Sequence, residues 1–218
     1  MAQNSETIAE TGAFMTAEDL ARLPDDEGKY ELVEGRLVKM PPTGGGHDSI
    51  ASRLHIALGA FVEAHNLGEC TLSQAGYRLS LPGKPDTVLA PDLAFVRADR
   101  LPQPGTAAWD EFWQLARDLV VEVVSPSESR PKMEALAREP QARMREPGSR
   151  KHQPPKARAR QWLDAGARLV WLIWPKAKQV EVWQPGSNKP TQTLSVSDLL
   201  DGLDVVPGFS YPIARLFR

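Results

Sequence analysis

The chain has 218 residues and a mass of 24.0 kDa, which is enough for one well-buried domain and too little for two full ones. Apolar residues make up 41% and charged residues 25%, as in ordinary soluble proteins, and no apolar stretch approaches the length of a membrane span. The formal net charge of -2 and the pI near 6.1 argue against binding of nucleic acid through overall basic charge.

The N-terminal residues MAQNSETIAETG are polar and acidic, without the basic and apolar regions of a secretory signal. We therefore expect residues 1–14 to form a disordered segment ahead of a domain over residues 15–218. Cys70 is the one cysteine, which excludes a disulfide framework and a cysteine-based zinc site. Both features favour a cytoplasmic protein.

Two elements are expected near the start of the chain. TAEDLARL (16–23) predicts a short helix with Thr16 as its N-cap and Asp19 three residues further on. KYELVEGRLVKM (29–40) alternates between apolar and polar residues and breaks at Gly35, which predicts a β-hairpin with a tight turn.

The middle of the chain predicts one longer helix and several strands. IASRLHIALGAFVEAHN (50–66) has apolar residues at helical spacing, and Asp48 or Ser49 can cap it. Strands are then expected over 71–81, 91–96 and 118–124.

The last third predicts a short helix over ARARQWLDAG (157–166), ending at Gly166, and strands over 168–174 and 179–185. The final stretch, residues 205–217, is too irregular for an assignment. This order of elements predicts an α/β (α+β) fold in which a mixed β-sheet is flanked by helices.

A proline-rich stretch, ALAREPQARMREPGSRKHQPPK, interrupts the strand, turn and helix around it and indicates an insertion at about 131–155. Arginine and lysine outnumber acidic residues there. The stretch is either a solvated, poorly ordered loop or an arm that contacts phosphates, and the sequence leaves both interpretations open.

Glu122 lies in the apolar run LVVEVV (119–124), where a buried strand is expected. A buried lone carboxylate costs several kcal/mol unless a cation, a proton or hydrogen bonds compensate for it. Residues two apart in a strand share a face, so Glu122 can face a cleft while its neighbours fill the core. The compensating partner is either a metal ion or an arginine in a buried ion pair.

Asp92 follows a proline at the mouth of another short strand. With Glu122 it could hold one hard divalent cation, because Mg²⁺ prefers one or two carboxylates and leaves room for a phosphate oxygen, as metal-assisted phosphodiester hydrolysis requires. Asp92 could instead be a turn residue, Glu31 an exposed strand residue, and His47 a loop or capping residue.

Six motifs occur in one order along the chain: YELVEGRLV, GGGHDSIASRL, LAPDLAFV, DLVVEVVSPS, QWLDAGARLVWLIWP and VVPGF. Their succession resembles the Uma-two family of restriction-endonuclease-like proteins, in the PD-(D/E)XK nuclease superfamily, from about Met15 to Phe217. The resemblance implies a mixed sheet with flanking helices, Mg²⁺ (or Mn²⁺) as cofactor, and DNA as substrate. It implies Asp92 and Glu122 as metal ligands, supported by Glu31 and His47.

The chain departs from the family pattern at one position. The superfamily signature has a lysine two residues after the glutamate, where this chain has Val124, and the resembled family supplies its lysine from the following helix. Arg158 stands at that helical position, and an arginine cannot act as a base because it stays protonated. Lys156 is the nearest lysine, but it is expected about 200° around the helix from Arg158.

The leading hypothesis is a metal-dependent DNA endonuclease in which Arg158 or Lys156 steadies the charged phosphate. The alternative is a weakened or inactive nuclease fold that acts in DNA binding or regulation, which Arg158 favours. DNA is the expected partner in both cases and a membrane is not, and the sequence leaves open whether the protein is a homodimer.

Overall fold

The computed structural model describes residues 14–24, 28–114, 117–125 and 153–218. Residues 1–13 of the expected N-terminal segment and residues 131–152 of the expected insertion lie outside these residues. The helices are α2 (Ala17–Ala21), α3 (Gly45–Ala64), α4 (Ala107–Asp110) and α6 (Pro155–Asp164), with short 3₁₀ turns η2 (Ala98–Arg100) and η4 (Ile213–Arg215).

The larger sheet has six strands in the order β10-β9-β8-β7-β6-β3. Their bounds are β3 (Gly68–Leu72), β6 (Leu93–Arg97), β7 (Leu119–Val123), β8 (Leu169–Trp174), β9 (Gln179–Trp183) and β10 (Gln192–Leu194). The central pair β7 and β8 is parallel, and α6 lies between them in the chain, whereas the other neighbours pair antiparallel. This arrangement confirms the predicted mixed sheet.

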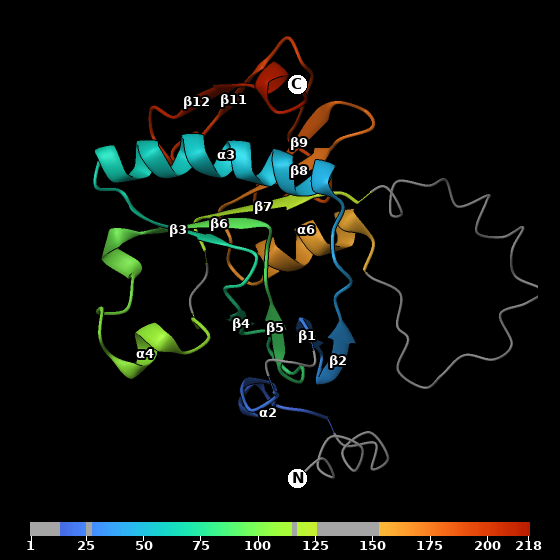
Figure 1. Ribbon diagram of the computed structural model, residues 1–218, viewed down its shortest axis with the longest axis vertical. Coiled ribbons are helices and arrows are strands. Elements are labelled where there is room, and N and C mark those ends of the chain that lie inside the picture. Colours follow the sequence, from blue (N-terminus) through green and yellow to red (C-terminus); the bar gives the residue numbers. More distant parts are fainter. Residues whose placement is uncertain (1–13, 25–27, 115–116, 126–152) are drawn as a thin grey trace, which may run out of the picture.

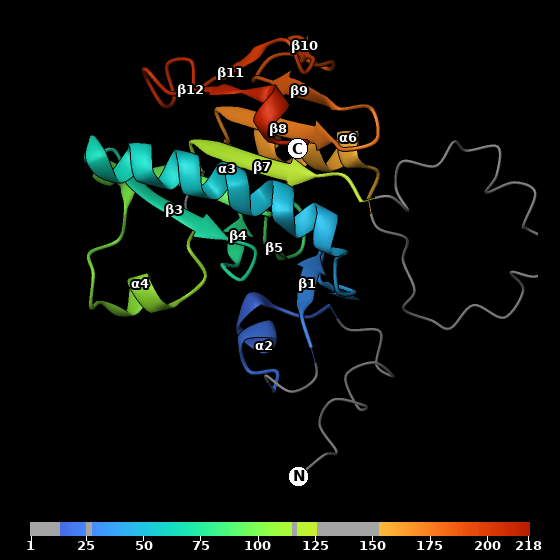
Figure 2. The ribbon, with the colours of Figure 1, turned by 45° about the horizontal axis from the view of Figure 1, so that its top comes forward.

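A second sheet has the order β2-β1-β5-β4, and a third contains β11 and β12. The bounds are β1 (Tyr30–Val33), β2 (Arg36–Lys39), β4 (Tyr77–Leu79), β5 (Thr87–Leu89), β11 (Leu199–Asp201) and β12 (Ser210–Pro212). Figure 2 shows β11 and β12 at one end of the molecule and β1 with α2 at the other.

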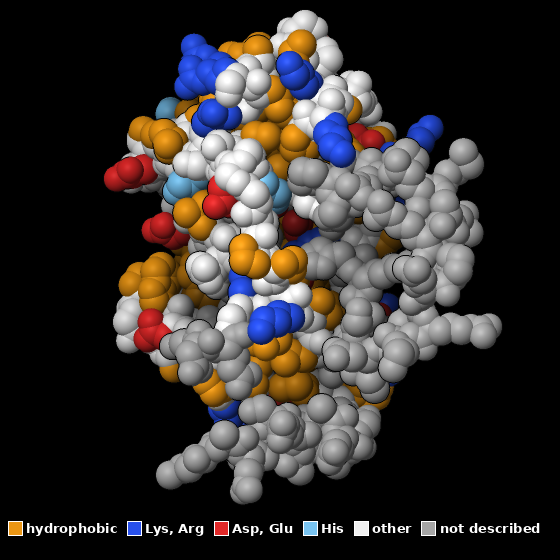
Figure 3. Space-filling model, turned by 45° about the vertical axis from the view of Figure 1, so that its right-hand side comes forward, with side chains coloured by type: hydrophobic (Ala, Val, Ile, Leu, Met, Phe, Trp, Pro, Cys, Tyr) orange, Lys and Arg blue, Asp and Glu red, His pale blue; other side chains and the backbone are white. Residues whose placement is uncertain are grey.

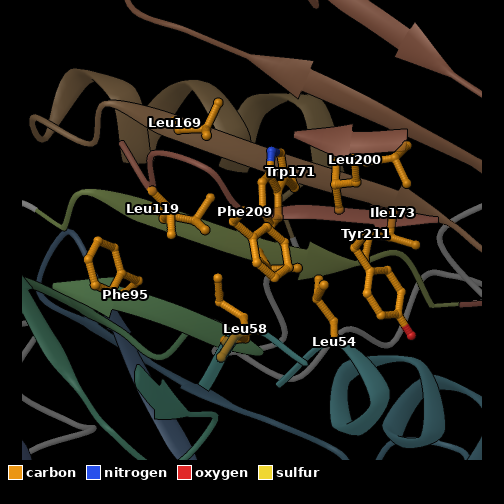
Figure 4. Close-up of a cluster of buried hydrophobic side chains, with 14 of the residues drawn as sticks. Leu54, Leu58, Phe95, Leu119, Leu169, Trp171, Ile173, Leu200, Phe209 and Tyr211 are labelled. Atoms are coloured by element: carbon orange, nitrogen blue, oxygen red, sulfur yellow. The ribbon is translucent and has the colours of Figure 1, made fainter. Parts of the chain in front are cut away.

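The larger sheet lies between α3 on one face and α6 on the other (Figure 1). Alternate residues of β7 divide accordingly: Leu119 and Val121 belong to the core under α3, and Val120 belongs to the core against α6. The C-terminal segment completes the first core, where Phe209 and Tyr211 pack beside the side chains of α3 and β8 (Figure 4). Glu122 therefore projects from the α6 face of a sheet that is covered on both sides.

Local sequence signals were accurate at the start of the chain. Thr16 and Asp19 form a reciprocal capping box at α2. The hairpin of β1 and β2 turns at Glu34 and Gly35, whose φ angles of 49° and 72° are those of a tight turn with both central residues left-handed.

Two expectations about elements were wrong. Residues 71–81 do not form one strand: the chain turns at Ser73 and Gln74, where Ala75 N–H bonds to the carbonyl oxygen of Leu72, and β3 and β4 belong to different sheets. Helix α3 begins at Gly45 rather than after Asp48. The C-terminal stretch, for which no assignment was made, contains β12.

No helix in the described part of the chain is long and apolar enough to cross a membrane. In the face shown in Figure 3, lysine and arginine side chains are most frequent toward the end that holds the C-terminal elements. Aspartate and glutamate side chains lie mainly along one margin of that face.

Candidate active site

Asp92 and Glu122 are brought together by strand register. Leu93 pairs with Val121 in the antiparallel ladder of β6 and β7, so Asp92 lies opposite Glu122 at the end of β7. The backbone N–H of Val123 donates a hydrogen bond of 2.7 Å to Oδ2 of Asp92. The two carboxylates are thus held at neighbouring strand ends, as the sequence predicted.

Helix α6 supplies two hydrogen-bond donors to Glu122. Two donors reach its Oε1: Nε of Arg158 at 2.7 Å and Nε1 of Trp162 at 2.6 Å. Arg158 and Trp162 are four residues apart and therefore lie on the same face of the helix. The position of Glu122 depends on how α6 packs on the sheet.

Arg158 joins a second carboxylate to this cluster. Its two terminal nitrogens donate to the two oxygens of Glu31 at 2.7 and 2.8 Å, and one of them also donates to the carbonyl oxygen of Ala90 at 3.2 Å. Ala90 returns a backbone N–H bond to Glu31 at 2.9 Å. Four of the five N–H donors of the guanidinium are therefore engaged, and Arg158 is the cation that Glu122 faces.

His47 reaches the cluster from the first turn of α3. Its Nε2 lies 3.2 Å from Oδ2 of Asp92, the same oxygen that accepts from Val123. Burial disfavours the imidazolium, but the contact with Asp92 outweighs it and raises the pKa of His47 above 6.5. His47 is therefore a site neighbour, not a loop residue.

Burial is the main cause that raises the pKa of Glu122, and the nearby charge of Asp92 adds to it; Arg158 and Trp162 oppose them, and the result is about 7. Burial acts on Glu31 as well, but there Arg158 prevails and lowers the pKa. Burial disfavours the charged form of Arg158, but the charges of Glu122 and Glu31 outweigh it and hold the pKa of Arg158 well above its ordinary value, so it stays charged.

The chain matches the model of a known protein family over most of its length. The family model of Uma2, described as "Putative restriction endonuclease", matches residues 17–214. The chain belongs to the Uma2 family. The match spans every residue of the cluster described above.

The fold of this Uma2 protein is also found in a solved structure. The crystal structure of a putative nuclease belonging to DUF820 from Anabaena variabilis is similar, with a TM-score of 0.64 and 18% sequence identity. The similarity covers 93% of this chain and 97% of the Anabaena chain. At this identity the likeness concerns the fold alone. No curated protein matches in sequence.

The structure does not bring Lys156 to the cluster of this Uma2 protein. Its ammonium pairs with Glu181 of β9 at 2.8 Å and lies over the ring of Trp174. Glu181 shares a row of the sheet with Glu122, two strands away, because both are paired with Leu172. Lys156 and Arg158 thus contact different carboxylates on the same sheet face.

Three further residues of this Uma2 protein belong to the surroundings of the site and were not expected there. Trp162 bonds to Glu122, as described above, and also stacks on Arg117, whose guanidinium lies between the rings of Trp162 and Tyr77 at 4.0 and 3.7 Å. Lys29, at the start of the hairpin, is half-buried within the field of the same carboxylates. No local pattern in the sequence distinguishes these residues from an ordinary core tryptophan and ordinary surface cations.

Asp92 and Glu122 each have a carboxylate oxygen that could bind a divalent ion. Within the described part of the chain, Oδ1 of Asp92 and Oε2 of Glu122 accept no hydrogen bond, and neither is enclosed without a partner. Among the same residues, no group of three or more His, Cys, Asp or Glu side chains could hold a metal ion. Two carboxylate oxygens with water as the other ligands fit Mg²⁺, which keeps several waters when it binds proteins.

Proposed function

We propose that this Uma2 protein is a metal-dependent DNA endonuclease that hydrolyses phosphodiester bonds in the cytoplasm. The observation that carries the proposal is the pair Asp92 and Glu122 on adjacent strand ends, each with one unengaged oxygen. Mg²⁺ or Mn²⁺ is the proposed cofactor. A divalent ion bound there supplies a water of lowered pKa and polarises a phosphoryl oxygen.

The protein groups have separate roles in this proposal. The N–H of Val123 and the imidazole of His47 contact Oδ2 of Asp92 and leave its other oxygen free to bind the ion. Trp162 and Arg158 do the same for Glu122. Arg158 orients and neutralises carboxylates, and it takes no proton from water because its pKa lies far above neutral pH.

Nicking of supercoiled plasmid tests the proposal. The parent should nick DNA with Mg²⁺ or Mn²⁺ and not with a chelator, and Asp92→Asn and Glu122→Gln should each abolish this. Glu181→Gln is a matched control, because Glu181 is also a buried carboxylate on the same sheet face but pairs with Lys156. Equal losses in all three variants would assign the effect to the fold instead of the site.

A calorimetric titration of the same variants tests the ion separately from catalysis. Asp92→Asn and Glu122→Gln should weaken Mg²⁺ or Mn²⁺ binding, and Glu181→Gln should leave it unchanged. Unchanged affinity in the first two variants would remove the metal from the proposal.

One observation favours a second candidate, a catalytically inactive DNA-binding or regulatory protein. The family resemblance implies a lysine at this helical position, whereas this chain has Arg158, which is fixed between Glu31 and Glu122. A parent that binds DNA in a gel-shift assay but never nicks it, at any Mg²⁺ or Mn²⁺ concentration, would favour this second candidate.

A further inference from the structure

Lys29 is a cation near the carboxylate cluster, and the proposed function gives it no role. The backbone N–H of Met40 donates to the carbonyl oxygen of Lys29 at 2.8 Å, which extends the ladder of β1 and β2 by one pair. Lys29 is therefore extended and lies two residues before Glu31, so both side chains leave the hairpin on the same face. This is the face that Arg158 contacts.

The ammonium of Lys29 makes fewer polar contacts than the guanidinium of Arg158. It donates a hydrogen bond to the carbonyl oxygen of Ser73, and within the described residues it makes no ion pair. Burial lowers the pKa of Lys29, and the charge of Arg158 adds to this. Glu31, Asp92 and Glu122 act in the opposite direction, so Lys29 lies within reach of their field.

A pocket makes Lys29 accessible beside the cluster. Its volume is about 360 Å³, within the range of small-ligand pockets, and its lining includes Lys29 and Ala90 together with the apolar residues Leu20, Leu23, Val88 and Phe112. Ala90 is the residue whose carbonyl oxygen accepts from Arg158. The pocket thus adjoins the Arg158 and Glu31 pair at one of its walls.

The cluster contains more carboxylates than permanent cations. Glu31, Asp92 and Glu122 face one permanent cation, Arg158, which is already engaged on four of its N–H groups. Without a divalent ion at Asp92 and Glu122, a phosphate that approaches this cluster is repelled by the excess of carboxylates unless another positive group meets it. Lys29 is half-buried, forms no ion pair with a described carboxylate, and is one of the residues that line the adjoining pocket.

We propose that Lys29 binds a phosphate group of the DNA beside the carboxylate cluster, and so provides the substrate contact that Arg158 cannot make. The inference rests on the proposed function for its substrate, but not on catalysis. It assigns the pocket at Lys29 and Ala90 as the place where the phosphate backbone passes the site.

The test measures binding of a short DNA duplex by fluorescence anisotropy, at several salt concentrations and without divalent ions. Lys29→Gln keeps a donor for Ser73 but removes the charge, and it should weaken binding about tenfold, as the loss of one charge-assisted contact does. The slope of log affinity against log salt should fall by about 0.9, the value for one phosphate. Lys29→Arg should restore both values.

Lys39→Gln is the matched control, since Lys39 is an exposed lysine on the other strand of the same hairpin, over the ring of Tyr30. An equal effect of Lys39→Gln, an unchanged salt slope in Lys29→Gln, or no DNA binding by the parent at low salt would each overturn the inference.

The plasmid assay separates this inference from the proposed function. If Lys29→Gln shows the expected binding defect while the parent never nicks plasmid, the phosphate site stands and the endonuclease proposal fails. If the parent nicks plasmid and Lys29→Gln binds DNA as the parent does, the endonuclease proposal stands and the role of Lys29 fails.

Discussion

Arg158 is the residue on which the geometry of the site depends. One side chain binds Glu122, which comes from β7, and Glu31, which comes from the hairpin of the other sheet. A planar guanidinium can hold two carboxylates in this way because its donors point in fixed directions, whereas a lysine ammonium acts as a point charge. A lysine at position 158 would therefore change the geometry of the site as well as its basicity.

We expect Arg158→Lys to lower the free energy of unfolding by about 2 kcal/mol and Arg158→Met by about 3–5 kcal/mol, since the second leaves two buried carboxylates without a cation. Urea denaturation measures both. Arg160→Lys is the control, because Arg160 is exposed on the same helix and bonds to the carbonyl oxygen of Asn188. Its expected change is within about 0.5 kcal/mol. Equal effects at the two positions would contradict the assigned importance of the ion pairs.

Glu122 and His47 predict how the stability of the metal-free protein varies with pH. The pKa of Glu122 is raised from 4.5 to about 7, so the folded chain retains a proton that the unfolded chain releases, and stability falls as pH rises across that interval. The pKa of His47 is raised above 6.5, so its contribution is present below that pH and is lost as pH rises above it. Both groups act in the same direction.

Urea denaturation in a chelator should therefore give a free energy of unfolding that falls between pH 5 and pH 8, by on the order of 2 kcal/mol. Glu122→Gln should flatten the lower part of this profile and His47→Gln the upper part. A parent profile that rises over the interval would show that neither group titrates as described.

At the scale of elements, helix α6 carries two contacts to one carboxylate, from Arg158 and Trp162. Trp162→Phe removes the indole donor and keeps a ring against Arg117. We expect this change to weaken Mg²⁺ affinity by about tenfold, the low end for residues that orient a metal ligand. Trp183→Phe is the control, because Trp183 makes the equivalent bond to Glu181, at 3.1 Å. Calorimetric titration compares the two, and an equal loss in both would argue against a specific role of Trp162.

Elements with strong local signals could be predicted from the sequence, and elements defined by distant contacts could not. The hairpin and α2 are specified by Gly35 and Thr16, whose effects act within a few residues. The division of residues 71–81 between two sheets follows from their partners, because β3 pairs with β6 and β4 pairs with β5, which no local pattern encodes. Short strands such as β5 and β11 gain their partners only through the tertiary fold.

The same distinction applies to the site. Glu122 could be recognised because a carboxylate within a valine run conflicts with burial, and Asp92 because a proline precedes it at a strand mouth. The sequence predicts a metal ion or an arginine as the partner of Glu122, and the structure shows Arg158 there. Lys29 could not be recognised, because a lysine before a strand is common and its neighbours come from other sheets and from α6.

At the scale of the whole molecule, net charge does not describe where DNA would bind. The stretch between residues 131 and 155 has an excess of basic residues in an otherwise acidic chain. If this stretch binds phosphates, deleting residues 134–153 should flatten the slope of log DNA affinity against log salt by about 0.9 for each phosphate that is no longer bound. Gel-shift titrations at several salt concentrations measure it.

A control for the deletion keeps the length of the chain and changes the charge. This control variant replaces four arginines of the stretch by glutamine: Arg138, Arg143, Arg145 and Arg150. This variant should give a similar reduction of the slope. If the deletion variant fails to fold while the substituted variant is normal, the stretch serves the fold and not the DNA.

The parallel pairing of β7 with β8 has a consequence for how the chain can be divided. These strands pair over five residues from Leu119 to Val123, and Arg158 bonds to Glu122 across the same boundary. Neither contact requires a covalent link between Ser125 and Gln153. Two separately encoded fragments, 1–140 and 141–218, should therefore assemble when co-expressed and co-purify through a tag on one of them. Glu122→Lys should reduce their recovery, since it places a cation against Arg158, and recovery that is insensitive to Glu122→Lys would show that the fragments associate in another way.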